Sequence, residues 1–135
     1  MPNTPNKEEE ELNNINLFQS GLWSSRYFQY DQWHGPHQLS LNFDSQTMKV
    51  TGSGIDNVGS FTIEGLYSKE TRRIGLTKRY QLDTGDPSRN FGHSVVFRLT
   101  WNTENHQFEG TYHVLIYKWQ ENIIELKFNG TLNEV

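Results

Sequence analysis

The 135-residue chain contains no cysteine. Disulfide bridges, cysteine-ligated zinc and thiol catalysis are therefore excluded. It also has no run of about 18 apolar residues, so no membrane-spanning helix is predicted. The first 15 residues lack the basic start and the apolar stretch of a secretion signal. We therefore expect a cytoplasmic protein with no membrane partner.

Apolar residues and positive charge are also scarce. Hydrophobic residues make up 33% of the chain, its net charge is −4 and its mean hydropathy is −0.78. The negative charge argues against a nucleic-acid partner bound by general electrostatics. Aromatic residues nevertheless reach 13%, which is unusual for a disordered chain. The length accommodates one folded domain.

The N-terminal segment differs from the rest of the chain. Residues 1–17 include two prolines, a run of four glutamates and very few apolar side chains. Such a segment cannot bury enough apolar surface to offset the entropy lost on ordering. We interpret 1–17 as a flexible acidic tail and 18–135 as the folded domain. An acidic docking arm is the functional alternative for this tail.

Apolar and polar residues alternate with a period of two from about residue 20 onward. Leu39, Leu41 and Phe43 fall on one face of such a segment, whereas Ser40 and Asn42 fall on the other. This period is typical of β-strands, and one polar face is typical of an antiparallel sheet that is wet on one side. The alternation predicts about eight strands, at 20–30, 37–44, 47–54, 58–67, 72–80, 92–101, 106–116 and 122–132.

Short connections rich in turn residues separate these segments, the first of them predicted at His34-Gly35-Pro36. Short connections favour strands that are neighbours in space. Eight such strands would leave two exposed edges unless the sheet closed on itself. We therefore predict an all-β fold, a single antiparallel up-and-down β-barrel of about eight strands. Such a barrel encloses room for side chains or for one small ligand. Glycines recur inside the predicted strands, and relief of crowding in a strongly bent sheet would account for them.

One motif resembles a known group of barrels. Gly21-Leu22-Trp23 at the start of the first strand resembles the entry motif of the calycins, which include lipocalins, fatty-acid-binding proteins and avidins. Segments 50–67 and 97–112 are most similar in spacing to strands of avidin and streptavidin. The resemblance covers most of residues 20–119. It implies a small-molecule cavity in the barrel mouth, with Trp23 as a plug at the closed end.

The biotin-contacting residues of avidins are matched only in part. Trp101 matches a tryptophan that lines the family's ligand cavity, and Trp119 lies near the place of another. Phe108 stands in place of a cavity tryptophan, and Gly54 in place of a ligand-binding tyrosine. No aspartate can be placed at the family's last ligand position. The resemblance therefore implies a ligand-sized cavity rather than a complete biotin site.

We predict non-catalytic binding of a small, partly apolar ligand. Tryptophan and tyrosine suit pocket walls because each joins an apolar body to a polar tip. The candidate ligand-binding residues are Ser25, Tyr27, Gln29, Asp56, Trp101, His106, Tyr112 and Trp119. Neither catalytic residues nor a cofactor or metal ion are assigned, and a homo-oligomer is compatible with the sequence.

Two alternatives remain open at this point. One is a protein-interaction barrel with a packed interior, using Trp33 and Tyr117 as exposed anchors. The other is a small barrel enzyme of the isomerase or cyclase type, using His93 or His106 with a carboxylate. A cavity of about 300 Å³ or more would favour ligand binding, whereas a fully packed interior would exclude it.

Two clusters of polar residues have competing interpretations. His34 and His37 could share a metal ion only if the turn between them brought them together, and we interpret them as exposed imidazoles. The basic stretch 69–79 could form an anion-binding patch. We favour its interpretation as a charged strand that protects a sheet edge from aggregation.

Overall fold

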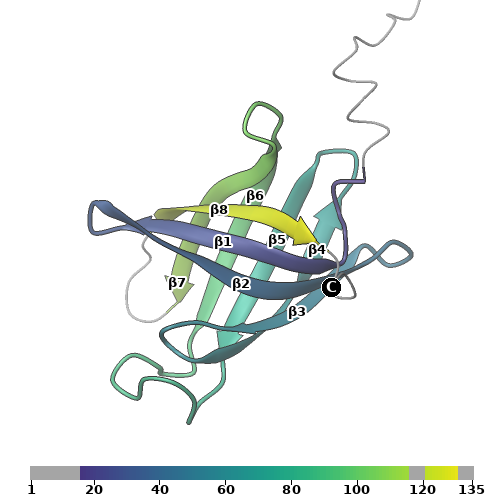
Figure 1. The fold of residues 1–135 in the computed structure, drawn as a ribbon. Helices are drawn as coiled ribbons and strands as arrows, with labels where there is room; N and C mark the ends of the chain where they lie inside the picture. Colours follow the sequence, from purple (N-terminus) through teal and green to yellow (C-terminus); the bar gives the residue numbers. More distant parts are fainter. Residues whose placement is uncertain (1–15, 116–120, 131–135) are drawn as a thin grey trace, which may run out of the picture.

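The computed structural model describes residues 16–115 and 121–130, which form eight antiparallel strands and, within those ranges, no helix (Figure 1). The strands are β1 (Gly21–Gln29), β2 (Gln32–Asp44), β3 (Lys49–Ile55), β4 (Ser60–Ser68), β5 (Arg73–Tyr80), β6 (Ser94–Asn102), β7 (Gln107–Leu115) and β8 (Glu121–Gly130). Each strand pairs with the next along the chain, and β8 pairs with β1, so the sheet is a closed barrel. The predicted all-β barrel of eight antiparallel strands is confirmed. No segment of the described ranges forms a helix able to cross a membrane.

Alternate side chains of each strand point into the barrel, and the apolar ones among them form its core. In β6, Val95, Phe97 and Leu99 are buried, whereas Arg98 and Thr100 are exposed. Successive side chains of a strand point to opposite faces of the sheet. A one-layer barrel needs only one apolar face per strand, so a chain with 33% hydrophobic residues can still build a core.

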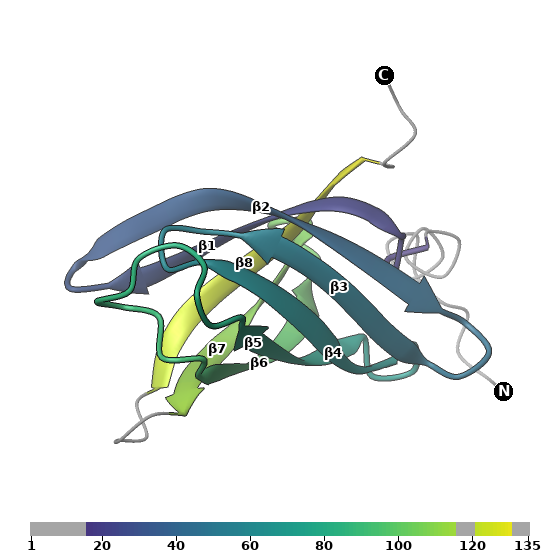
Figure 2. The same ribbon diagram turned by 90° about the horizontal axis from the view of Figure 1, so that it is seen from below.

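The first hairpin differs from its prediction. The β1–β2 turn is formed by Tyr30 and Asp31, which have φ values of 54° and 60°, and not by His34-Gly35-Pro36. Two central residues with positive φ suit the twist of a tight hairpin, but a tyrosine there carries no turn signal in the sequence. β2 therefore begins earlier than predicted and forms a long hairpin with β1 (Figure 2).

Gly35 lies within β2, opposite the register shift in β1. Its φ is +113°, and a Cβ there would lie 2.8 Å from the carbonyl oxygen of Ser25. Gly35 therefore lies at a bulge in the β1–β2 ladder and not in a turn. Only glycine fits this backbone conformation and this close approach.

Aromatic rings fill one end of the barrel. Trp23 is 1% exposed, and its indole Nε1 donates a hydrogen bond to the carbonyl oxygen of Gln19 at 2.8 Å. The Phe108 ring lies 6.0 Å from Trp23 and 5.6 Å from Phe18, measured between ring centroids. Leu17 and Phe18, just before β1, are buried in the same cluster. Trp23 therefore lies at a closed end, and Leu17 belongs to the packed part of the chain although the sequence placed it in the tail.

Candidate functional site

The opposite end of the barrel is hollow. A cavity of about 470 Å³ lies where β1, β3 and β5 end and β2, β4 and β6 begin. The apolar wall of this cavity consists of Leu39, Val58, Phe61, Val95, Phe97, Val114 and Ile124. Its polar lining consists of Ser25, Tyr27, Gln29, Tyr30, His37, Asp56, Lys78, Tyr80, Arg89, His93 and Tyr112. The interior is therefore not packed solid, in contrast to the packed-barrel alternative.

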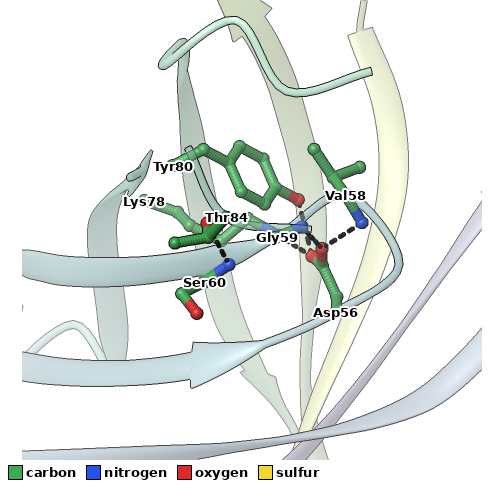
Figure 3. A network of polar contacts seen from close by, with 7 residues as sticks. All are labelled: Asp56, Val58, Gly59, Ser60, Lys78, Tyr80 and Thr84. Atoms are coloured by element: carbon green, nitrogen blue, oxygen red, sulfur yellow. Dashed lines mark hydrogen bonds and ion pairs between the residues drawn. The ribbon is translucent and has the colours of Figure 1, made fainter. Parts of the chain in front are cut away.

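The carboxylate of Asp56 lies at the centre of the polar contacts (Figure 3). Its Oδ1 accepts hydrogen bonds from the backbone N–H groups of Val58 at 2.9 Å and Gly59 at 3.3 Å. Its Oδ2 accepts hydrogen bonds from Lys78 Nζ at 3.0 Å and from the Tyr80 hydroxyl at 2.5 Å. Burial raises the pKa of Asp56, but the charge of Lys78 and these hydrogen bonds outweigh it and hold the pKa below its ordinary value. One carboxylate thus shapes the β3–β4 turn and ties it to β5.

Lys78 is enclosed by aromatic rings. Its side chain is 13% exposed, and its Nζ lies 4.6 Å from the ring centroid of Phe61, 4.8 Å from that of Tyr80 and 5.6 Å from that of Phe97. Such contacts favour the ammonium form. Burial lowers the pKa of Lys78, and the carboxylate of Asp56 opposes this effect. The ammonium group is therefore held beside the cavity's apolar wall by one ion pair and three rings.

The connection between β5 and β6, residues 81–93, is fastened to the β3–β4 turn. The Thr84 hydroxyl accepts a hydrogen bond from the Ser60 backbone N–H at 2.9 Å. The buried side-chain amide of Asn90 donates to the carbonyl oxygens of Gln81 at 2.7 Å and Thr84 at 2.9 Å. These bonds fix the longest loop of the barrel, which brings Arg89 to the rim of the cavity.

Tyr27 forms the opposite wall of the cavity mouth. Its ring stacks on those of His34 and His37, with centroids 4.9 Å and 5.9 Å away, and meets the Tyr112 ring edge-on at 5.7 Å. Burial raises the pKa of Tyr27, while the positive charge of Arg89 acts in the opposite direction. The Tyr27 side chain is thus positioned between the histidines of β2 and the cavity.

The two histidines that line the cavity should make the folding stability depend on pH. Burial lowers the pKa of both His37 and His93 below the ordinary 6.5. The unfolded chain therefore binds more protons than the folded protein as the pH falls through that value, and folding stability should decrease there. We expect urea midpoints to fall between about pH 7.5 and about pH 5.

Substitution of His93 isolates its contribution to this pH dependence from those of the other titrating groups. The variant His93→Gln should flatten the pH dependence of the urea midpoint. The matched variant His106→Gln, at an exposed turn, should leave it unchanged. An unaltered slope in His93→Gln would show that His93 contributes nothing to this dependence.

Five of the candidate ligand-binding residues line the cavity, namely Ser25, Tyr27, Gln29, Asp56 and Tyr112. Trp101 and His106 do not. β6 runs from the open to the closed end, so Trp101 near its terminus packs on Phe108, with ring centroids 5.1 Å apart. His106 is exposed in the β6–β7 turn with a φ of 52°. Trp119 and Tyr117 lie outside the described residues.

Lys78, Tyr80, Arg89 and His93 line the cavity but were absent from the ligand-binding candidates, although His93 was a candidate of the enzyme alternative. The signal for Lys78 and Tyr80 was present, because the buried Ile74 and Leu76 place them in phase on the inward face of β5. The interpretation of residues 69–79 as edge protection is wrong, because β5 pairs with both β4 and β6 and is no edge.

Among the described residues, no contact supports the metal site or the enzyme alternative. His34 Nε2 lies 3.1 Å from the carbonyl oxygen of Gln29. Residues 16–115 and 121–130 contain no group of three histidine, aspartate or glutamate side chains placed to hold a metal ion. The His93 ring contacts Tyr80 and Phe91, at centroid distances of 4.8 Å and 6.0 Å. No hydrogen bond within the described residues joins His93 to a carboxylate.

Comparison of the chain with protein-family models, with curated proteins and with solved structures found no match.

Proposed function

We propose that this protein binds a small, partly apolar molecule in the open end of its barrel and does not convert it chemically. The observation that carries the proposal is the cavity of about 470 Å³, which is lined by seven apolar residues, four tyrosines and seven other polar residues. Pockets of about 300–1,000 Å³ with this composition are typical of small-molecule sites. The apolar wall would supply most of the binding free energy, and the polar groups would orient the ligand.

Three polar side chains of the cavity are positioned by contacts within the protein. Asp56, Lys78 and Tyr80 hold one another through the hydrogen bonds of Figure 3. Fixing side chains in advance reduces the conformational entropy that binding would otherwise cost. This arrangement supports a binding site more directly than it supports a catalytic site, because no histidine–carboxylate hydrogen bond is present in the described residues.

A calycin-like and more narrowly avidin-like relationship forms part of the proposal. It is supported by the Gly21-Leu22-Trp23 motif at the start of β1, by the buried Trp23 and by the closed barrel of eight strands. Biotin is the ligand that this resemblance offers for a test. A titration that leaves the tryptophan fluorescence unchanged at about millimolar biotin would end the avidin-like variant and would leave the general proposal in place.

A neutral fluorescent dye tests the cavity itself. Phenylnaphthylamine should bind the folded protein saturably, with increased and blue-shifted emission. The variant Val114→Trp places a large side chain in the cavity, since Val114 lines it, and should weaken dye binding at least about tenfold.

The matched control is Val96→Trp, on the neighbouring strand β6. Val96 does not line the cavity and faces away from it, because the flanking Val95 and Phe97 point inward. This variant should bind the dye as the wild type does. Circular dichroism should show that both variants remain folded. Absence of saturable binding, or equal binding by Val114→Trp and the wild type, would contradict the proposal.

A further inference from the structure

The charges that line the cavity do not cancel. Its described lining contains two basic side chains, Lys78, which is paired with Asp56, and Arg89, and one carboxylate, that of Asp56. The cavity therefore has an excess of one positive charge, whereas the whole chain carries −4. A positive, partly desolvated site in an acidic protein favours anions over cations.

Asp56 has no capacity left for a cationic ligand. Its two oxygens already accept four hydrogen bonds, two from backbone N–H groups and two from Lys78 and Tyr80. A carboxylate offers about four lone-pair positions. An ammonium ligand would therefore have to displace an existing partner of Asp56, and it would meet the charge of Lys78 at the same place.

Hydrogen-bond donors, in contrast, remain available. Lys78 Nζ carries three hydrogens, and its hydrogen bond within the described residues goes to Asp56. Tyr112 is 5% exposed and lines the cavity, and its buried hydroxyl has no hydrogen-bond partner in the part of the chain that the structure describes. Because burial raises the pKa of Tyr112, this group keeps its proton and acts as a donor. Buried hydroxyl groups are nearly always satisfied, so this one calls for a hydrogen-bond partner from the bound molecule or from water, and it can donate to an anionic head group.

Arg89 adds a second positive charge at the rim. Its side chain is exposed, and its charge acts on the hydroxyl groups of both Tyr27 and Tyr80. The field of Arg89 therefore reaches the same region as the Asp56–Lys78 pair. Within the described lining there is no second carboxylate, and the carboxylate that acts on Arg89, that of Asp86, lies outside the lining.

We propose that the molecule bound in this cavity is a small amphipathic anion. Its negatively charged head group accepts hydrogen bonds from Lys78 and Tyr112 under the field of Arg89, and its apolar body packs on Phe61 and Phe97. This inference rests on the proposed function, because it specifies the ligand class of the same cavity.

Three compounds with one naphthyl body and different head groups test the charge. Naphthylacetate is an anion, naphthylethanol is neutral and naphthylethylammonium is a cation. Each is titrated against the full-length protein loaded with phenylnaphthylamine, and dye displacement gives its affinity. We expect naphthylacetate to bind at least about tenfold more tightly than naphthylethanol, the effect of one charge-assisted hydrogen bond. Naphthylethylammonium should bind most weakly.

Arg89→Gln tests the source of the preference without altering the Asp56–Lys78 pair. It should weaken naphthylacetate binding about threefold to fivefold, as expected for a partly screened surface charge. Naphthylethanol binding should weaken less than naphthylacetate binding. The matched control is Arg73→Gln. It also removes one positive charge, but from an exposed position at the start of β5, the end away from the cavity. It should leave all three affinities unchanged.

The outcomes distinguish this inference from the function on which it rests. Equal affinities for naphthylacetate and naphthylethanol, or tightest binding of naphthylethylammonium, would overturn the anion while leaving cavity binding intact. Equal effects of Arg89→Gln and Arg73→Gln would overturn the role of Arg89. If the dye itself does not bind, or binds Val114→Trp as well as the wild type, both the function and this inference fail.

Discussion

Replacing Gly110 with alanine should destabilise the barrel by about 3 kcal/mol or more. A Cβ at this position would lie 1.8 Å from the carbonyl oxygen of Arg98 on the neighbouring strand. The obstacle is backbone and not the end of a flexible side chain, so relief requires a shift of the β6–β7 pairing. The same conflict exists at Gly65, where a Cβ would lie 1.9 Å from the carbonyl oxygen of Gly75. Urea unfolding followed by tryptophan fluorescence measures the loss.

Gly75 provides a matched control within the same sheet. A Cβ there would have no heavy atom within 4 Å, so Gly75→Ala should keep the fold. It should even stabilise it by about 0.5–1 kcal/mol, because alanine loses less backbone entropy than glycine in a strand. Similar stabilities of Gly110→Ala and Gly75→Ala would show that these glycines do not mark crowded positions.

Replacing Lys78 with methionine should cost about 3–5 kcal/mol of folding stability. The substitution keeps an unbranched side chain of similar length but leaves the Asp56 carboxylate buried without its cation. The side chain of Asp56 is only 10% exposed, so water cannot replace the ammonium group fully. Chemical denaturation of the variant and of the wild type measures the difference.

A double variant separates the loss of the ion pair from the loss of packing. Asp56→Asn removes the charge but retains an oxygen that can accept the Val58 N–H bond. Asp56→Asn combined with Lys78→Met should therefore be more stable than the sum of the two single losses predicts. Lys127→Met, at an exposed position on β8, controls for the change of lysine to methionine and should alter stability by less than about 0.5 kcal/mol. Strict additivity, or a Lys78→Met effect as small as that of Lys127→Met, would contradict a coupled buried pair.

One local turn signal was misleading. His34-Gly35-Pro36 had the composition of a turn, but Gly35 lies at a bulge, and the chain reverses at Tyr30 and Asp31. The reason is that glycine marks any backbone position with positive φ or close approach, whether in a turn or inside a strand. Composition alone does not distinguish these two uses.

Strand periodicity predicted the candidate site only in part. Tyr27 and Gln29 lie at the end of β1 that reaches the open mouth, and they line the cavity. Trp101 shares the apolar phase of β6 but lies near its other end, where it packs on Phe108. Periodicity indicates whether a side chain points inward, but not which end of the barrel it reaches.

The sequence by itself determined the class of fold. A period of two over about eight short segments requires strands with one apolar face, and exposed edges favour closure of the sheet. The tertiary structure alone decided which polar residues meet. Asp56 from the β3–β4 turn, Lys78 and Tyr80 from β5 and Arg89 from the following loop converge at one open end. Their meeting depends on strand register and on the path of the loop, which are long-range properties that local alternation does not contain.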